Sequence, residues 1–180
     1  MKIVEDVLPV EQSDWLEEML KSPELQWSYI PDSSGNVPDG ERQFPSFSHP
    51  VLNTADRNPI TDKDMFFRLE CVNHSVAKKA GLNLWNMNRV RLGMHIPDPT
   101  WTSHHGPHTD QRPRHDVVLY YVNNSDGDTY FFDDDEQVID RITPKKNTMV
   151  VFDGHTVHAS SYPTKGQRIT INFNYSKGKR

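Results

Sequence analysis

The chain has 180 residues, of which 34% are hydrophobic and 25% are charged, and its formal net charge is −5. This length suits one globular domain with one substantial core, and the hydrophobic content excludes a fully disordered chain. The acidic balance does not favour non-specific binding to nucleic acids or to anionic membranes, so we do not expect a nucleic acid as a partner.

Three features bear on where the protein works. Cys71 is the single cysteine, so no internal disulfide can form, which favours a reducing compartment. The N-terminus lacks the basic start and the apolar run of a signal peptide. No stretch approaches the roughly 20 apolar residues of a membrane helix. We therefore expect a soluble, cytoplasmic protein without membrane contact, and we make no prediction of its oligomeric state.

The first half of the chain carries the helical patterns. The segment Glu11–Lys21 predicts a helix that stops before Pro23, with apolar residues at helical spacing: Trp15, Leu16, Met19 and Leu20. A second helix is expected from the capping-box-like Thr61–Asp64 to Gly81, with an apolar stripe of Met65, Leu69, Val72 and Val76. Between them, the segment Pro31–Pro59 is rich in Pro, Gly, Ser and Asn and predicts a long surface loop.

From about Asn88 the pattern changes to short β-like runs separated by turn residues. Strands are predicted over residues 89–96, 117–122, 129–132, 137–142, 148–152 and 168–175. Helices followed by many short strands predict a mainly β fold, a double-stranded β-helix (jelly roll) with the N-terminal helices packed on its outer face. We expect a single domain over residues 1–180, with a helical and loop part at 1–87 and the jelly-roll core at about 88–176.

Two short motifs contain residue types that bind metal ions. His108 and Asp110 are two positions apart, so on an extended segment their side chains point to the same side. This pair is a weak indication by itself in a chain with nine histidines. The later segment Asp153–Ser160 offers His155, next to a turn glycine, and His158, at the start of the next extended segment. Two histidines and one carboxylate form the facial triad of iron(II) enzymes, whereas zinc sites more often recruit a third histidine or a cysteine.

The last predicted strand alternates polar and apolar residues. One face carries Arg168, Thr170, Asn172 and Asn174, and the other carries Ile169, Ile171, Phe173 and Tyr175. Composition alone favours an ordinary strand whose polar face lies in water. A ligand-holding barrel would instead turn the polar face inward. A buried Arg168 would then need an anion, and a dicarboxylate could supply one, with Thr170 adding a hydroxyl.

The motifs His108-Thr109-Asp110, His158 and Arg168-Ile169-Thr170, in this order and with these gaps, resemble the iron(II)/2-oxoglutarate oxygenases of the prolyl-hydroxylase type. The resemblance runs from about Arg89 to Tyr175. It selects His158 over His155, because the histidine and the arginine of that family are separated by a similar gap. It implies that the iron ligands are His108, Asp110 and His158. It also implies that 2-oxoglutarate contacts Arg168, Thr170 and Tyr121.

The resemblance further implies a 2-oxoglutarate-dependent dioxygenase, a hydroxylase that oxidises a C–H bond while 2-oxoglutarate is decarboxylated to succinate. Its cofactors would be Fe(II), the co-substrate 2-oxoglutarate and O2, with ascorbate as an optional reductant. The substrate would be a peptidyl residue, such as proline, or a small molecule. One departure concerns the strand Arg91–Ile96, which lacks the tyrosine that the family often places there. His95 is either a substitute for this tyrosine or an ordinary strand histidine.

Two other function classes compete with this interpretation. A cupin-like metal-binding or isomerase domain without oxygen chemistry would need no co-substrate arginine, so Arg168 and Thr170 argue against it. An oxidative demethylase of nucleic-acid bases would carry a second arginine where this chain has Asn174. His104 and His105 are left without a role. Substrate choice is expected to depend on the loops at residues 31–59 and 97–107.

Overall fold

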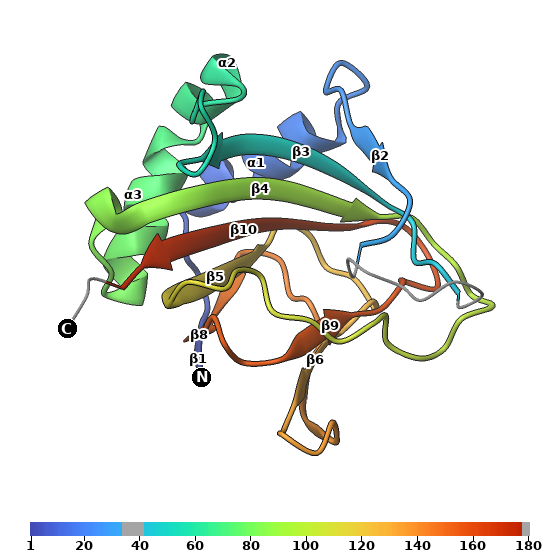
Figure 1. Ribbon diagram of the computed structural model, residues 1–180. Coiled ribbons are helices and arrows are strands. Elements are labelled where there is room, and N and C mark those ends of the chain that lie inside the picture. Colours follow the sequence, from blue (N-terminus) through green and yellow to red (C-terminus); the bar gives the residue numbers. More distant parts are fainter. Residues whose placement is uncertain (34–41, 178–180) are drawn as a thin grey trace.

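The computed structural model describes residues 1–33 and 42–177 and consists of two antiparallel sheets with helices on one outer face (Figure 1). The large sheet has seven strands in the order β1-β8-β5-β10-β4-β3-β2, and the small sheet has three in the order β7-β6-β9. The strands are β1 (Lys2–Val4), β2 (Ser28–Ile30), β3 (Ser46–Asn53), β4 (Met87–His95), β5 (His115–Tyr121), β6 (Thr129–Phe132), β7 (Val138–Ile142), β8 (Thr148–Asp153), β9 (His158–Ser160) and β10 (Arg168–Ser176). The six predicted strands correspond to β4, β5, β6, β7, β8 and β10, with ends that differ by two residues or fewer.

The helices cover the face of the large sheet that lies away from the small sheet. They are α1 (Val10–Lys21), α2 (Lys63–Arg68), α3 (Glu70–Ala80) and the short 3₁₀ helix η1 (Leu84–Asn86). The first predicted helix is confirmed, and Gly81 ends α3 in the left-handed conformation, with φ 76°. The prediction of one helix from residue 61 to 81 is wrong, because the chain breaks at the fully buried Leu69. The apolar period continues through both helices, so it does not reveal this break.

The prediction of a loop over Pro31–Pro59 is wrong for β3, which pairs with β4. Pro50 hides this strand from pattern analysis, because proline lacks the N–H that a ladder needs and the pairing shifts register between Pro50 and Leu52. Residues 34–41 of the predicted loop lie outside the described residues. The three-residue strands β1 and β2 form the two edges of the large sheet. The part at 1–87 therefore adds three strands that the sequence did not predict.

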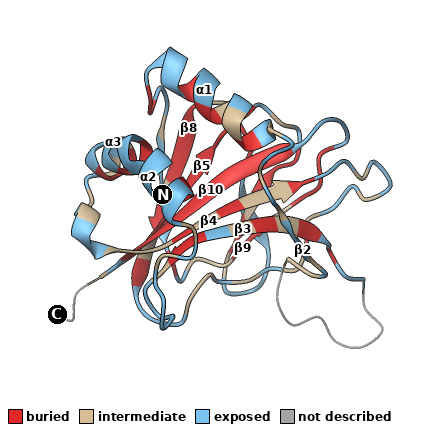
Figure 2. Ribbon diagram, turned by 90° about the horizontal axis from the view of Figure 1, so that it is seen from above, coloured by how far each residue is buried: buried red, intermediate tan, exposed pale blue. Residues whose placement is uncertain are grey.

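Strand β10 is buried on both faces, so neither its polar face nor its apolar face lies in water. Its apolar residues join the core beneath the helices, together with Leu16, Leu20, Leu69, Val72 and Val76. Its polar residues face the space between the two sheets, where Asn172 and Asn174 bond to Asp110. Figure 2 shows β10 and β5 as a buried band beneath helices with exposed outer sides. The ordinary-strand interpretation favoured by composition is therefore wrong, because a second sheet covers the polar face.

No helix in residues 1–33 or 42–177 is long and apolar enough to cross a lipid bilayer. Cys71 lies exposed on α3 as a free thiol.

Candidate metal centre and ligand pocket

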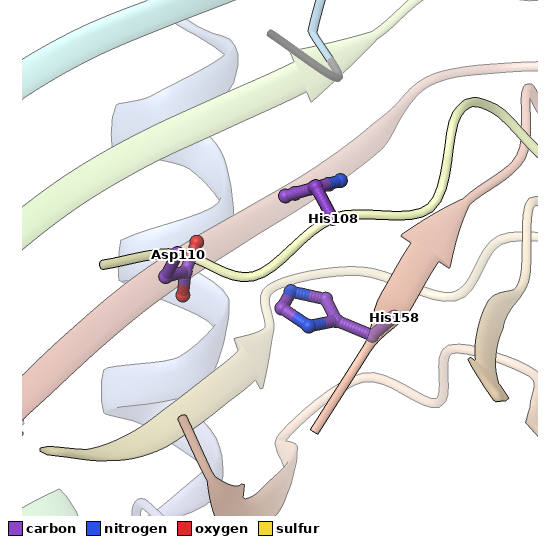
Figure 3. Close-up of side chains that lie close together, drawn as sticks. All are labelled: His108, Asp110 and His158. Carbon is purple, nitrogen blue, oxygen red and sulfur yellow. The ribbon is translucent and has the colours of Figure 1, made fainter. Parts of the chain in front are cut away.

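His108, Asp110 and His158 meet at one point between the two sheets (Figure 3). One ligand atom from each residue lies within 4.8 Å of those of the other two. The backbone holds the two histidines opposite each other, since each N–H donates to the other's carbonyl oxygen at 3.0 Å. Such reciprocal pairing places opposed side chains on the same side of the ribbon, and Asp110, two residues further along, points the same way.

Both histidine rings are oriented by backbone carbonyls. His108 Nδ1 lies 3.1 Å from the carbonyl oxygen of Gly106, and His158 Nδ1 lies 3.0 Å from that of Thr156. A carbonyl oxygen can only accept, so each Nδ1 carries the proton and each Nε2 keeps a lone pair for a metal ion. Burial lowers the pKa of His158, which favours the neutral ring that a metal needs.

The Asp110 carboxylate is held by two amides. Its Oδ2 accepts hydrogen bonds from Asn172 Nδ2 at 2.8 Å and from Asn174 Nδ2 at 3.0 Å. Arg89 Nη1 lies 3.8 Å from the other oxygen, Oδ1. Burial alone would raise the pKa of Asp110, but His158, Arg89 and the Asn172 amide hold it well below its ordinary value. The carboxylate is therefore ionised, as a metal ligand must be.

A cavity of about 220 Å³ connects the three candidate ligands with Arg168 and Thr170. Gly93 of β4 lies beside Thr170 of β10 in the sheet register. A Cβ atom at Gly93 would come within 3.3 Å of Thr170 Oγ1, which is tighter than ordinary contact. Glycine therefore keeps space open beside this hydroxyl, and the cavity can hold a ligand that reaches from the metal centre to Arg168.

Arg168 lies at the far end of the cavity and is 3% exposed. Its Nε donates to the Gly127 carbonyl oxygen and its Nη2 donates to Thr129 Oγ1, both at 2.8 Å. Among the described residues it forms no ion pair, and burial lowers its pKa. A buried guanidinium that forms no ion pair favours an anionic ligand. A carboxylate of that ligand can bind the guanidinium through two parallel hydrogen bonds. The residues present therefore fit a dicarboxylate whose other end reaches the metal.

Tyr121, which is expected to contact the co-substrate, is hydrogen-bonded to Thr129. Tyr121 is fully buried and is not among the residues that line the cavity. Its hydroxyl donates to Thr129 Oγ1 at 2.9 Å, and Thr129 itself lines the cavity. Because Thr129 accepts from both Tyr121 and Arg168, its own hydroxyl proton is left to donate to a ligand. Thr129 therefore presents its hydroxyl to the cavity, and the hydrogen bond from Tyr121 orients it.

The remaining histidines are separate from the metal centre. His155 is exposed, with Nε2 3.2 Å from the carbonyl oxygen of Arg112, so it does not join His108 and Asp110. His95 lines the cavity in register with Arg168, and its Nε2 lies 3.2 Å from Ser160 Oγ. His105 shares the same hydroxyl at 3.1 Å, and burial lowers its pKa to about 3. Burial lowers the pKa of His95 as well, so both rings are neutral.

Sequence reasoning missed several residues that complete the site. Asn172 and Asn174 were placed on the polar face of the last strand, but their bonds to Asp110 depend on which sheet covers that face. No local pattern marks the others, because they reach the cavity from strands distant in the sequence: Ser46, Ser48, Arg91, Gly93 and Thr129.

Comparisons with known proteins bear on the family and on the fold. Residues 92–176 match the sequence profile of the 2OG-Fe(II) oxygenase superfamily, which confirms the predicted resemblance for that segment. No curated protein sequence matches the chain.

Solved structures share the whole fold. A prolyl-4-hydroxylase from Pseudomonas putida aligns with a TM-score of 0.62 and 14% identity, over 98% of this chain and 92% of that one. A prolyl hydroxylase from Trichoplax adhaerens, solved with a peptide fragment of hypoxia inducible factor, aligns with a TM-score of 0.61 and 14% identity, over 97% and 82%. The epimerase SnoN, solved with Fe³⁺ and alpha-ketoglutarate, aligns with a TM-score of 0.59 and 13% identity, over 97% and 78%. These similarities confirm the predicted jelly-roll class.

Proposed function

We propose that this protein, whose residues 92–176 match the 2OG-Fe(II) oxygenase superfamily, is an iron(II)- and 2-oxoglutarate-dependent dioxygenase that hydroxylates a C–H bond. One observation carries the proposal. A His-Asp-His cluster and a buried arginine without an ion pair among the described residues face each other across a single cavity. The cluster supplies a facial triad, and the arginine supplies a counter-charge for a dicarboxylate.

Each residue has a defined task in this proposal. His108, Asp110 and His158 hold iron(II), and Arg168 binds the distal carboxylate of 2-oxoglutarate, with hydrogen bonds from Thr129 and Thr170. Bound together, iron(II) and 2-oxoglutarate would supply the oxidising chemistry with O2, leaving succinate and CO2. The chain contributes geometry, because the backbone pairing of the histidines and the two amides on Asp110 set the ligand directions before any ion binds.

The competing function classes fit the site less well. A cupin-like metal site would not use Arg168, although the arginine is almost fully buried and forms no ion pair among the described residues. In a base demethylase the position of Asn174 would carry a second arginine, whereas here Asn174 supports Asp110. We therefore favour a peptide or a small molecule as the substrate.

The proposal is tested by anaerobic titration of the protein with iron(II) and 2-oxoglutarate. We expect a visible metal-to-ligand charge-transfer band in the wild type, because keto-acid chelation of iron(II) produces one. His158→Ala should abolish it. His155→Ala is the matched control, since this exposed histidine lies three residues away and should leave the band unchanged. A folded, iron-loaded wild type without the band would contradict the oxygenase assignment and favour the cupin-like alternative.

The type of reaction needs a separate measurement, because an epimerase shares this fold. In air, a hydroxylase forms one succinate per substrate oxidised, and the product gains the mass of one oxygen atom. Mass spectrometry of the product therefore separates hydroxylation from epimerisation, which leaves the mass unchanged. Labelling with ¹⁸O2 should place the label in the product alcohol.

A further inference from the structure

Arg91 is a second arginine that lines the cavity. It lies on β4 in register with Asn172 of β10, the residue that holds Asp110. Arg168 is in register with His95, four positions further along β4. Alternate residues of a strand share one face, so Arg91 marks the metal end of the cavity and Arg168 the far end.

The guanidinium of Arg91 has no hydrogen bond and no ion pair within residues 1–33 and 42–177. Its side chain is half-buried, and burial lowers its pKa; the charge of Arg89 lowers the pKa further, while the charge of Asp110 raises it. A guanidinium offers five N–H donors and no acceptor, so in a partly dry cavity it favours an anion. Arg91, like Arg168, therefore favours an anionic ligand as its ion-pair partner.

The carboxylates nearby have other partners. Asp110 is held by Asn172, Asn174 and Arg89 and faces the metal position. Asp32, at the rim of the cavity, accepts the backbone N–H of Phe44 at 3.0 Å. In the proposed complex, Arg168 would hold the distal carboxylate of 2-oxoglutarate, and the keto-acid end would be directed to the iron(II) held by His108, Asp110 and His158. Asp110 acts on Arg91 through its charge but forms no ion pair with it among the described residues, and neither carboxylate of the co-substrate is assigned to Arg91.

The wall beside Arg91 is polar as well. Ser46 and Ser48 of β3 line the cavity, and Ser48 is in register with Gly93. Neither serine side chain has a hydrogen bond within the described part of the chain. An apolar substrate group packed here would leave two hydroxyls and one guanidinium unsatisfied, which disfavours it strongly.

We propose that Arg91 is the anion-binding residue of the substrate site, so that the substrate carries a carboxylate or a phosphate group close to the C–H bond that is oxidised. This inference rests on the proposed function and names the substrate class for the same cavity. Both groups present oxygens that a guanidinium fork binds through two hydrogen bonds. Ser46 and Ser48 are placed to donate further hydrogen bonds to such a group or to hydroxyls of the same molecule.

The test uses three probes that share one branched alkyl chain: 3-methylbutanoate, 3-methylbutyl phosphate and the uncharged 3-methylbutanamide. Each is titrated calorimetrically into the anaerobic complex with iron(II) and saturating 2-oxoglutarate, so that Arg168 is already occupied. We expect at least one anion to bind the wild type about tenfold more tightly than the amide. Arg91→Met should remove this preference, and Arg91→Lys should keep part of it, because it retains the charge without the fork. Arg57→Met, at an exposed residue, is the matched control.

The outcomes separate the inference from the function on which it rests. Preference for the carboxylate or for the phosphate identifies the group. Equal binding of anions and amide to the wild type would overturn the inference, as would an unchanged preference in Arg91→Met. Loss of the charge-transfer band in Arg91→Met would assign Arg91 to the co-substrate and also overturn it. A wild type that forms no band would remove the proposed function itself.

Discussion

Replacing Arg168 by glutamine should weaken 2-oxoglutarate binding, so that 2-oxoglutarate stabilises the folded variant much less than the folded wild type. The guanidinium uses two of its five N–H groups on Gly127 and Thr129, which leaves the others for a carboxylate. Losing a hydrogen bond to a charged group weakens binding by about 1.5–3 kcal/mol, or roughly 10- to 150-fold. At a concentration 100 times its Kd, 2-oxoglutarate stabilises the wild type by about 2.7 kcal/mol. If the variant binds about 100-fold more weakly, only about 0.4 kcal/mol remains.

The assay is thermal unfolding of the iron(II)-loaded protein under nitrogen, with and without 2-oxoglutarate. In a chain of this size about 1 kcal/mol shifts Tm by roughly 2–4 °C, so we expect a shift of about 5–11 °C in the wild type and about 1–2 °C in Arg168→Gln. The exposed Arg57→Gln serves as the control for charge loss and should respond like the wild type. A full shift in Arg168→Gln would refute the assignment of this arginine to the co-substrate.

Three further predictions concern the surroundings of the site. Asn172→Leu removes one of the two amides on Asp110 and should weaken iron(II) binding by roughly 10- to 100-fold in a chelator competition, and unchanged affinity would contradict this. His105 has a pKa of about 3 in the folded state against 6.5 as its ordinary value, so the unfolded state alone takes up a proton as the pH falls below 6.5. Urea unfolding of the metal-free protein should show about 1.4 kcal/mol less stability at pH 5.5 than at pH 7.5 from this residue, and His105→Asn should lose that share of the pH dependence. A Cβ atom at Gly154 would overlap the buried His115 ring, so Gly154→Ala should lower the free energy of unfolding by about 1–3 kcal/mol, and an unchanged urea midpoint would refute the overlap.

The elements with a local period could be predicted from the sequence. Strand β10 alternates polar and apolar residues over its whole length, and α1 repeats apolar residues at helical spacing, so both were predicted with nearly their observed ends. Strand β3 was missed because Pro50 interrupts its pattern and its partner β4 is distant in sequence. The break at Leu69 was missed because a turn between two helices need not disturb an apolar period.

The candidate site divides in the same way. Spacing in the chain marked His108 with Asp110, and the resemblance to the oxygenase family selected His158 over His155 by its gap to Arg168. Only the tertiary structure brings these segments together, through a backbone pair between His108 and His158 that no local pattern encodes.

What the sequence determined by itself was the chemistry available: two histidines, one carboxylate and an arginine at characteristic intervals. What only the tertiary structure decided was the direction in which the polar face of β10 turns. The same alternation suits a strand whose polar side lies in water, and it became a ligand site because a second sheet covers that side. Arg91 shows the same dependence. Its charge is visible in the sequence, but only the tertiary structure shows that Arg91 forms no ion pair with the described residues that other strands place around the cavity.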